Sequence, residues 1–101
     1  MRITVNNREI ELKDANTFLK KLLGLMFKKN INYCLRIKTN SIHTMFMKEN
    51  IDIVMTDINN NVLYIYKNLG KNRFIIRKNV YYTYEFPHDF IDSNLKKINI
   101  N

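Results

Sequence analysis

The stretch IDIVMTDINNNVLYIY, residues 51–66, decides the class of fold. Two runs rich in isoleucine, valine and tyrosine, residues 51–57 and 62–66, flank the segment Ile58-Asn59-Asn60-Asn61. Short runs of this composition on either side of a polar segment are typical of two antiparallel strands joined by a loop. The stretch therefore predicts a β-hairpin in the middle of the chain.

The same pattern recurs on both sides of this hairpin. Residues 2–12 predict an N-terminal hairpin that turns at Asn6-Asn7, because asparagine tolerates the positive φ of a two-residue turn. Residues 33–38 and 43–47 predict two short strands, and residues 73–77 and 80–86 predict a hairpin that turns at Lys78-Asn79. Pro87 ends the last strand, because proline donates no hydrogen bond to a ladder.

One segment has the periodicity of a helix. Its apolar residues recur at spacings of three and four, which predicts one short helix over about Thr17–Leu23: Ala15, Phe18, Leu19, Leu22 and Leu23. Gly24 fits the left-handed position that follows a helix. Together the elements predict a mainly β fold, either a small barrel or two packed antiparallel sheets, with the helix closing one end.

Length and composition narrow the class of protein. The chain has 101 residues, 46% of them hydrophobic, which suits a single domain over residues 1–101. No stretch reaches the roughly 20 apolar residues of a membrane-spanning helix, and the first residues lack the apolar run of a signal peptide. A soluble cytoplasmic protein that makes no membrane contact is therefore expected. The single cysteine, Cys34, has apolar neighbours that predict a buried, inert thiol.

The net charge of +8 suggests nucleic acid as a partner, but two features argue against it. The basic residues are scattered, and only five of them are arginines. Lysine, asparagine and isoleucine, which have A/T-rich codons, are all abundant, so a low-G+C genome explains the bias without a basic site. Any binding of nucleic acid is then expected to be weak. A monomer or a weak homodimer is expected.

Two ordered blocks of residues resemble a known family. The first is Ala15-x-Thr17-x-x-x-Lys21-x-x-Gly24-Leu25-Met26-Phe27-Lys28, and the second is His43-Thr44-x-x-Met47-x-x-x-Ile51-Asp52-Ile53-Val54. A third, weaker block is Tyr84-Glu85-Phe86-Pro87. In composition and spacing these blocks are similar to the signatures of the family called domain of unknown function 192. The likeness spans roughly residues 15 to 87.

The resemblance assigns no activity, because the family as a whole has none. It implies structural roles for the motif residues Thr17, Gly24, Met26, Met47, Asn60 and Pro87. Asn60 stands where the family has a turn glycine, which asparagine replaces because it also adopts the left-handed region. The glycine-rich segment that the family has after Pro87 is replaced here by His88-Asp89-Phe90.

Three polar residues within apolar runs are candidates for chemistry. Asp52 acts either as a general base or ligand anchor, or as an acceptor for backbone N–H groups or an arginine such as Arg73. His43 either shuttles protons beside a carboxylate or closes the sheet through a hydrogen bond. Glu85 lies on the opposite face of its strand from Tyr84 and Phe86, and two carboxylates with a histidine suffice in principle for a divalent metal.

The register of the expected strands separates these interpretations. Only three residues lie between 43–47 and 51–57, so these two strands are expected to pair antiparallel and to place Asp52 opposite position 46. This register keeps His43 away from Asp52 and favours a structural role for the carboxylate. Neither a catalytic residue, a metal nor a cofactor is assigned, and there is no phosphate-cradling glycine loop, since the chain has only Gly24 and Gly70.

The leading hypothesis is a non-catalytic β module that binds a small ligand or a protein partner. Its expected contact surface comprises His43, Thr44, Asp52, Arg73 and Glu85. One alternative is a small enzyme, for instance a hydrolase, that uses His43 and Asp52. The other is a weak basic nucleic-acid binder. Methionines and tyrosines either line a pocket or fill a core without tryptophan.

Overall fold

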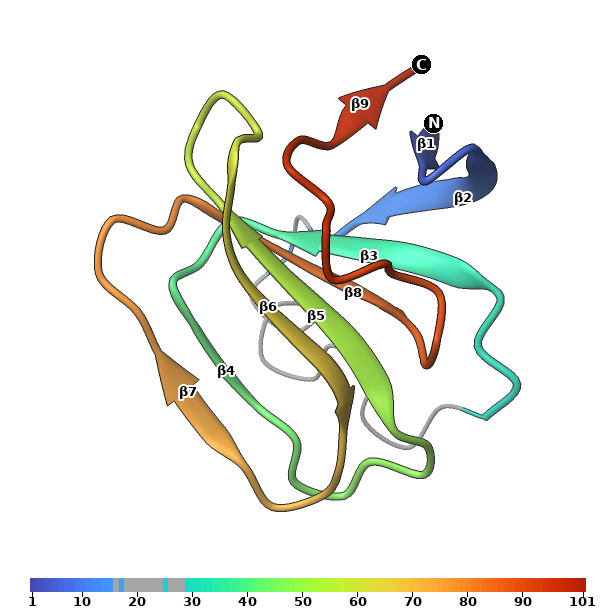
Figure 1. Cartoon of the computed structure of the whole chain (residues 1–101). Coiled ribbons are helices and arrows are strands. Elements are labelled where there is room, and N and C mark those ends of the chain that lie inside the picture. The colour runs from blue at the N-terminus through green and yellow to red at the C-terminus, as the bar shows by residue number, and fades with distance from the viewer. Residues whose placement is uncertain (16, 18–24, 26–28) are drawn as a thin grey trace.

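A computed structural model describes residues 1–15, 17, 25 and 29–101 of the chain. These residues form nine strands and no helix (Figure 1): β1 (Arg2–Val5), β2 (Arg8–Asp14), β3 (Tyr33–Ile37), β4 (Ser41–His43), β5 (Ile51–Thr56), β6 (Val62–Leu69), β7 (Phe74–Ile76), β8 (Tyr82–Pro87) and β9 (Asn99–Ile100). The predicted fold class, mainly β, is confirmed. The helix predicted over Thr17–Leu23 falls on residues that, Thr17 apart, lie outside the described ones. Over the described ranges, no helix has the length and apolar character to cross a membrane.

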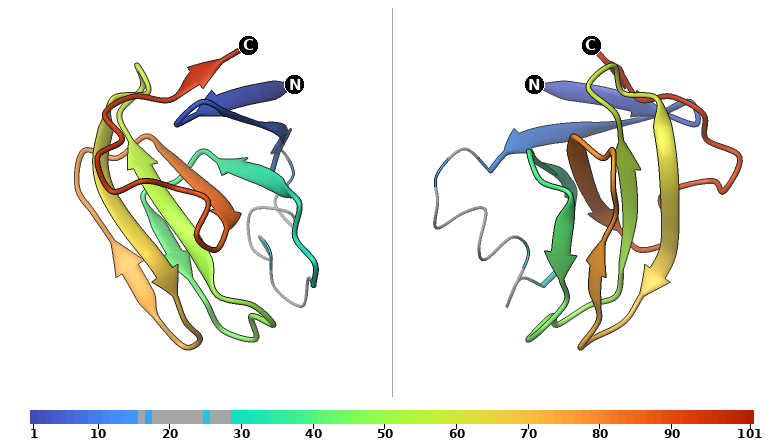
Figure 2. Two further views of the ribbon diagram at one scale, coloured as in Figure 1. Left: turned by 45° about the vertical axis from the view of Figure 1, so that its right-hand side comes forward. Right: turned by 90° about the vertical axis from the view of Figure 1, so that its left-hand side faces the viewer.

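Seven strands form one curled sheet in the order β6-β5-β8-β3-β2-β1-β9, and β4 and β7 form a small second sheet (Figure 2). All neighbours pair antiparallel except β2 and β3, which run parallel. The prediction of purely antiparallel sheets is wrong at this one pair. Residues 15–32 connect β2 to β3, and a parallel pair requires a long crossover connection of this kind.

β5 lies between β6 and β8 and is buried along its whole length. Successive side chains of a strand point to opposite faces of the sheet, so β5 contributes to two cores. We call them the first core (Ala15, Leu25, Ile31, Leu35, Ile37, Ile42, Met47, Ile51, Ile53, Met55, Leu69, Ile75) and the second core (Ile3, Val5, Ile10, Leu12, Cys34, Val54, Tyr84, Phe86, Ile91, Ile98). The small sheet covers the first core, and the C-terminal segment covers the second.

β8 pairs with β5 on one side and with β3 on the other. The predicted alternation along this strand is confirmed. Tyr84 and Phe86 lie in the second core, while Glu85 lies opposite Ile53 and Leu35 of the first core. Pro87 is the last residue of the strand, as predicted.

Two predicted pairings are wrong. The strand expected over residues 43–47 ends at His43, and it pairs with β7 rather than with β5. Strand β7 in turn does not pair with β8. Both edges of β5 are already occupied, by β6 and β8, so no edge remains for β4. Asp52 consequently lies opposite Phe86 and not opposite position 46.

Asparagines provide most of the left-handed turns. The N-terminal hairpin is confirmed, with φ of 53° at Asn6 and 64° at Asn7. The central hairpin of β5 and β6 is also confirmed, and Asn60 in its turn has φ of 66°. The amide oxygen of Asn60 also accepts a hydrogen bond from the Tyr84 hydroxyl. Asparagine tolerates this region because its short polar side chain bonds locally.

Replacing Asn7 by alanine should lower the free energy of unfolding by about 1 kcal/mol, because a non-polar Cβ is disfavoured at positive φ. Replacing it by glycine should leave stability within a few tenths of a kcal/mol of the parent. Urea unfolding of the two variants measures the difference. Equal destabilisation by both would show that the turn conformation is not what position 7 contributes.

Candidate functional site

The Asp52 carboxylate is fully buried on the second-core face of β5. Its Oδ1 accepts the backbone N–H of Asn68 at 2.8 Å, and its Oδ2 accepts the backbone N–H of Ile91 at 2.9 Å. The ladder between β5 and β6 shifts register at this point, since Ile51 pairs with Leu69 but Ile53 pairs with Tyr66. Asn68 lies in the resulting bulge with φ of 54°. The carboxylate therefore takes the place of a ladder acceptor that the bulge has displaced.

The prediction that backbone N–H groups satisfy Asp52 is confirmed. Arg73 contributes nothing to that carboxylate. Its backbone bonds to Thr44, and its side chain is exposed. Because both carboxylate oxygens hold main-chain donors inside the protein, Asp52 ties β6 and the C-terminal segment to the central strand.

Asp52→Ala should lower the free energy of unfolding by about 1–3 kcal/mol, because two buried N–H groups lose their acceptor. Asp52→Asn should cost less, since its amide oxygen still accepts from one of them. Thermal and urea unfolding at pH 7 provide the measurement. An alanine variant that melts with the parent would contradict the structural role.

Glu85 is buried on the other face of the sheet, in the first core. Burial raises the pKa of this carboxyl from its ordinary value of 4.5 to about 7, against the opposing effect of a hydrogen bond from the Leu25 backbone. Its Oε1 has no hydrogen-bond partner among the described residues. Near neutral pH, Glu85 is thus a partly protonated acid inside an apolar cluster.

The stability of the protein should depend on this group between pH 4.5 and about 7. The folded state holds the Glu85 proton more tightly than the unfolded state does. The contribution of this group to the free energy of unfolding is therefore fully present below pH 4.5 and is lost as pH rises through about 7. Glu85→Gln, which cannot ionise, should gain on the order of 2–4 kcal/mol relative to the parent between pH 4.5 and pH 8. Urea unfolding across this range tests the linkage. A difference that does not change with pH would contradict it.

The expected contact surface is not a single site. Asp52 and Glu85 lie on opposite faces of the large sheet. His43 ends β4, whose Ile42 packs into the first core, so His43 lies on the outer face of the small sheet opposite Phe74. The large sheet therefore separates His43 from Asp52, and the proton-transfer pair of the enzyme hypothesis does not form.

Thr44 joins the two loops at the end of the small sheet. Its N–H donates to the Arg73 carbonyl at 2.9 Å, and its Oγ1 accepts the Arg73 N–H at 2.8 Å. Its own carbonyl accepts the N–H groups of Asn72 at 3.2 Å and Met47 at 3.4 Å. Thr44 is completely buried. Three of these bonds join the 44–48 loop to the 70–73 loop, and the bond from Met47 lies within the first of them.

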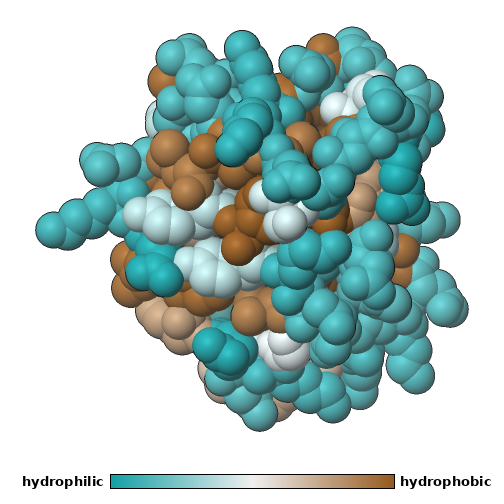
Figure 3. All heavy atoms as spheres, viewed as in Figure 1, coloured by the Kyte–Doolittle hydropathy of each residue, from teal (hydrophilic) through white to brown (hydrophobic). Residues whose placement is uncertain are grey.

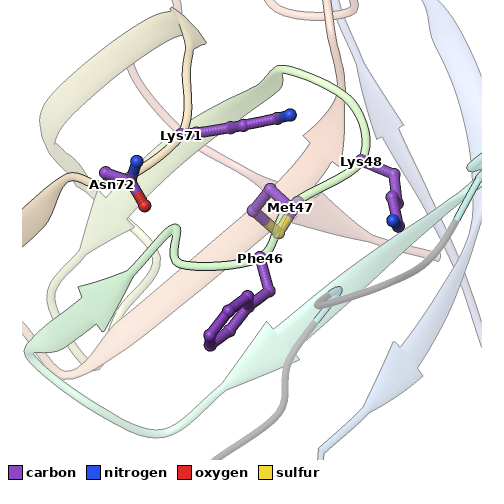
Figure 4. A pocket seen from close by; sticks show the side chains of 5 residues that line it. All are labelled: Phe46, Met47, Lys48, Lys71 and Asn72. Carbon is purple, nitrogen blue, oxygen red and sulfur yellow. The ribbon is translucent and has the colours of Figure 1, made fainter.

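A hollow of about 330 Å³ lies between these two loops. Figure 4 shows its lining residues arranged around Met47, which is buried in the first core: Phe46, Met47, Lys48, Lys71 and Asn72. Lys71 extends across the hollow toward the 44–48 loop, and Asn72 lies on the opposite side from Lys48 (Figure 4). Phe46 and Asn72 both have φ of 61°. A bulky residue in this region is a strained feature of the kind found at functional sites.

The charge of this hollow is positive. Lys48 and Lys71 form no ion pair with any described carboxylate. The nearest acid in sequence, Glu49, is engaged elsewhere, since its two oxygens accept the backbone N–H groups of Asn30 and Ile31. The hollow thus combines an apolar floor with two ammonium groups and an amide, which suits a small ligand with an anionic group.

The sequence identified the frame of this hollow but not most of its lining. Thr44 and Met47 belong to the recognised motif, and both are structural here. Phe46, Lys48, Lys71 and Asn72 were not predicted, because the pairing of β4 with β7 that brings their loops together leaves no periodic signal. The available indication was Asn72, since asparagine adopts the left-handed region more readily than other residues with a Cβ.

The remaining candidate residues lie outside the hollow or outside the described residues. Cys34 is buried, as predicted, and burial raises the pKa of its thiol. Thr17 is exposed, whereas Gly24 and Met26 lie outside the described residues. Within the described ranges, no three histidine, cysteine or acidic side chains gather in a way that could hold a metal ion.

The chain belongs to the family of uncharacterised proteins with the domain of unknown function 192. The model of that family, described as "Uncharacterized ACR", matches residues 1–97. The family resemblance noted in the sequence is thus confirmed.

Individual relatives are consistent with this assignment. A UPF0127 protein of Pyrococcus horikoshii is 42% identical over 57 residues, which cover 50% of either chain. A UPF0127 protein of Thermococcus sibiricus is 31% identical over 88 residues, covering 80% of this chain and 57% of the relative. The chain thus spans about half the length of these relatives.

The fold itself also occurs in a solved structure. A protein of unknown function from Novosphingobium aromaticivorans superposes with a TM-score of 0.82 at 12% sequence identity. The match covers 98% of this chain and 82% of the other. At this identity the likeness concerns the fold alone.

Proposed function

We propose that the chain is a binding module that takes a small carboxylate ligand with an apolar part into the hollow between the 44–48 and 70–73 loops. The observation that carries the proposal is that two lysines lie beside the apolar Met47 in one hollow. Neither lysine forms an ion pair with a carboxylate of the described residues. The hollow is near the lower end of the size range of small-molecule sites.

The ligand chemistry follows from the lining. Lys48 and Lys71 supply the charge that attracts an anion, and the Asn72 amide adds a donor that orients it. The Phe46 ring, 58% exposed, and the Met47 side chain offer apolar contact. An aromatic carboxylate uses both kinds of group, whereas acetate or inorganic phosphate uses only the charge.

The rigidity of the frame supports a binding role. The hydrogen bonds of Thr44 fix both loops before any ligand arrives, so little conformational entropy is lost on binding. Nucleophile, base and orienting group are not gathered in the hollow, and this favours binding over turnover.

Benzoate, acetate and inorganic phosphate are the probes, titrated into the full chain and followed by amide chemical shifts. Benzoate should shift the amides of Met47, Lys71 and Asn72 and bind more tightly than acetate. Lys71→Gln and Lys48→Gln should each weaken benzoate binding roughly three- to fivefold through loss of one ion pair. Lys78→Gln removes an exposed lysine outside the hollow and is the matched control.

Each alternative has a distinct result. Equal weakening by Lys78→Gln, or shifts spread evenly over the basic surface, would mean that benzoate senses net charge only. Phosphate binding as tightly as benzoate would show that apolar contact with Met47 contributes nothing to binding. Any of these three outcomes contradicts the proposed site.

A further inference from the structure

The small sheet leaves one edge of β7 without a ladder partner. The bonds from Thr44 N–H to the Arg73 carbonyl and from Arg77 N–H to the Asn40 carbonyl bracket its pairing with β4. Hydrogen-bonding residues alternate in an antiparallel pair, so residues 73, 75 and 77 direct their main-chain groups toward β4. The N–H and C=O groups of Phe74 and Ile76 therefore point away from β4, and in the described structure β7 pairs with no other strand.

The side chains along this edge are apolar and exposed. Phe74 is 69% and Ile76 is 57% exposed, while Ile75 between them is buried in the first core. Figure 3 shows apolar side chains gathered on the face over β6 and β7, with hydrophilic residues around them. Exposed apolar residues on an unpaired edge are a template for another strand, and natural proteins usually protect such edges.

β6 is the strand next to this edge, and it pairs only with β5. Figure 2 shows β7 lying between β4 and β6 in its right-hand view. No ladder joins the two strands, and the residue directly after β7, Arg77, contacts β6 through its side chain. Arg77 donates to the Tyr66 hydroxyl and lies over the rings of Tyr64 at 5.2 Å and Tyr66 at 5.7 Å. The curled sheet and the small sheet thus meet along a seam made by side chains, with no ladder between β6 and β7.

The charge along this seam has one sign. Residues 58–84, which include β6 and β7, contain no aspartate or glutamate, and their charged residues are Lys67, Lys71, Arg73, Arg77 and Lys78. The chain as a whole has nine acidic residues, so their absence here is a local feature. A partner that binds along β7 would meet Arg73 at one end of the strand and Arg77 at the other.

We propose that the free edge of β7 is a docking site for an extended acidic segment of a partner protein, which adds to the small sheet as a third strand. Main-chain bonds to Phe74 and Ile76 supply the pairing, and apolar side chains of the segment cover theirs. Its carboxylates pair with the cations at the two ends of β7, Arg73 and Arg77. The site adjoins the proposed ligand hollow at Arg73, but it uses the outer edge of β7 and none of the residues that line the hollow.

Two other occupants fit these observations less well. A second copy of this chain brings the same acid-free stretch to the edge, so its cations repel their equivalents. A nucleic acid matches the charge but has no alternating N–H and C=O groups with which to extend a sheet. The unpaired main chain of Phe74 and Ile76 is what favours a protein strand.

Amide hydrogen exchange on the full chain tests the pairing directly. The probe is a short blocked peptide that alternates glutamate and valine, and its lysine–valine counterpart is the charge-reversed control. At saturation, the acidic peptide should slow exchange of the Phe74 and Ile76 amides by about tenfold or more, since both gain an acceptor. The Ile75 amide, which already faces β4, should be unchanged.

Variants distinguish pairing at the β7 edge from non-specific apolar binding of the peptide. Ile76→Pro deletes one outward N–H, which an edge strand tolerates, and should abolish protection at Phe74 as well as peptide binding. If the proline variant fails to fold, Phe74→Ala serves in its place. It keeps the backbone N–H groups and should weaken peptide binding at least threefold. Ile58→Ser removes an isoleucine that is 58% exposed and lies between β5 and β6, and should have no effect.

Several results would overturn the proposal. These are unchanged exchange at saturating acidic peptide, equal protection by the lysine peptide, and protection by a single-stranded oligonucleotide at the same amides. Concentration-dependent dimerisation that protects Phe74 and Ile76 without any peptide would assign the edge to a second copy instead.

Discussion

The carboxylate of Asp52 accepts a backbone N–H from the bulge of β6 and another from the C-terminal segment, inside the sheet. A buried carboxylate is costly unless donors satisfy it, and here two main-chain donors that lack a ladder partner do so. The positions of β6 and of the C-terminal segment depend on these two hydrogen bonds. The Asp52 side chain of β5 accepts a hydrogen bond from each segment. β6 can therefore form its bulge, and the segment containing Ile91 can cover the second core.

Thr44 plays the corresponding role at the end of the small sheet. Its hydrogen bonds join two loops at the point where β4 ends, and the hollow lies between these loops. The same interruption shortens the β4–β7 ladder to three residue pairs and leaves the outer edge of β7 open. The proposed ligand hollow and the proposed docking edge are thus two consequences of one short strand pair.

Asparagine connects the composition to the conformation. Among the described residues other than glycine, those with positive φ are mostly asparagines: Asn6, Asn7, Asn30, Asn60, Asn68, Asn72 and Asn79. Of all the residues that carry a Cβ, asparagine is among the few that adopt this region readily, so a chain with two glycines can still make its tight turns. Phe46 and Asp89 are the exceptions, and Phe46 lines the hollow.

The sequence by itself determined the fold class, the two local hairpins, the faces of β8 and the burial of Cys34 and Asp52. Each depends on side-chain period or on neighbours a few residues away, which a linear pattern records. Only the tertiary structure decided that β4 pairs with β7, that β2 and β3 run parallel, and that Glu85 and Asp52 face different cores. Those outcomes depend on which strand edges remain free once β5 is enclosed between β6 and β8, and competition for edges between distant segments leaves no trace in local sequence.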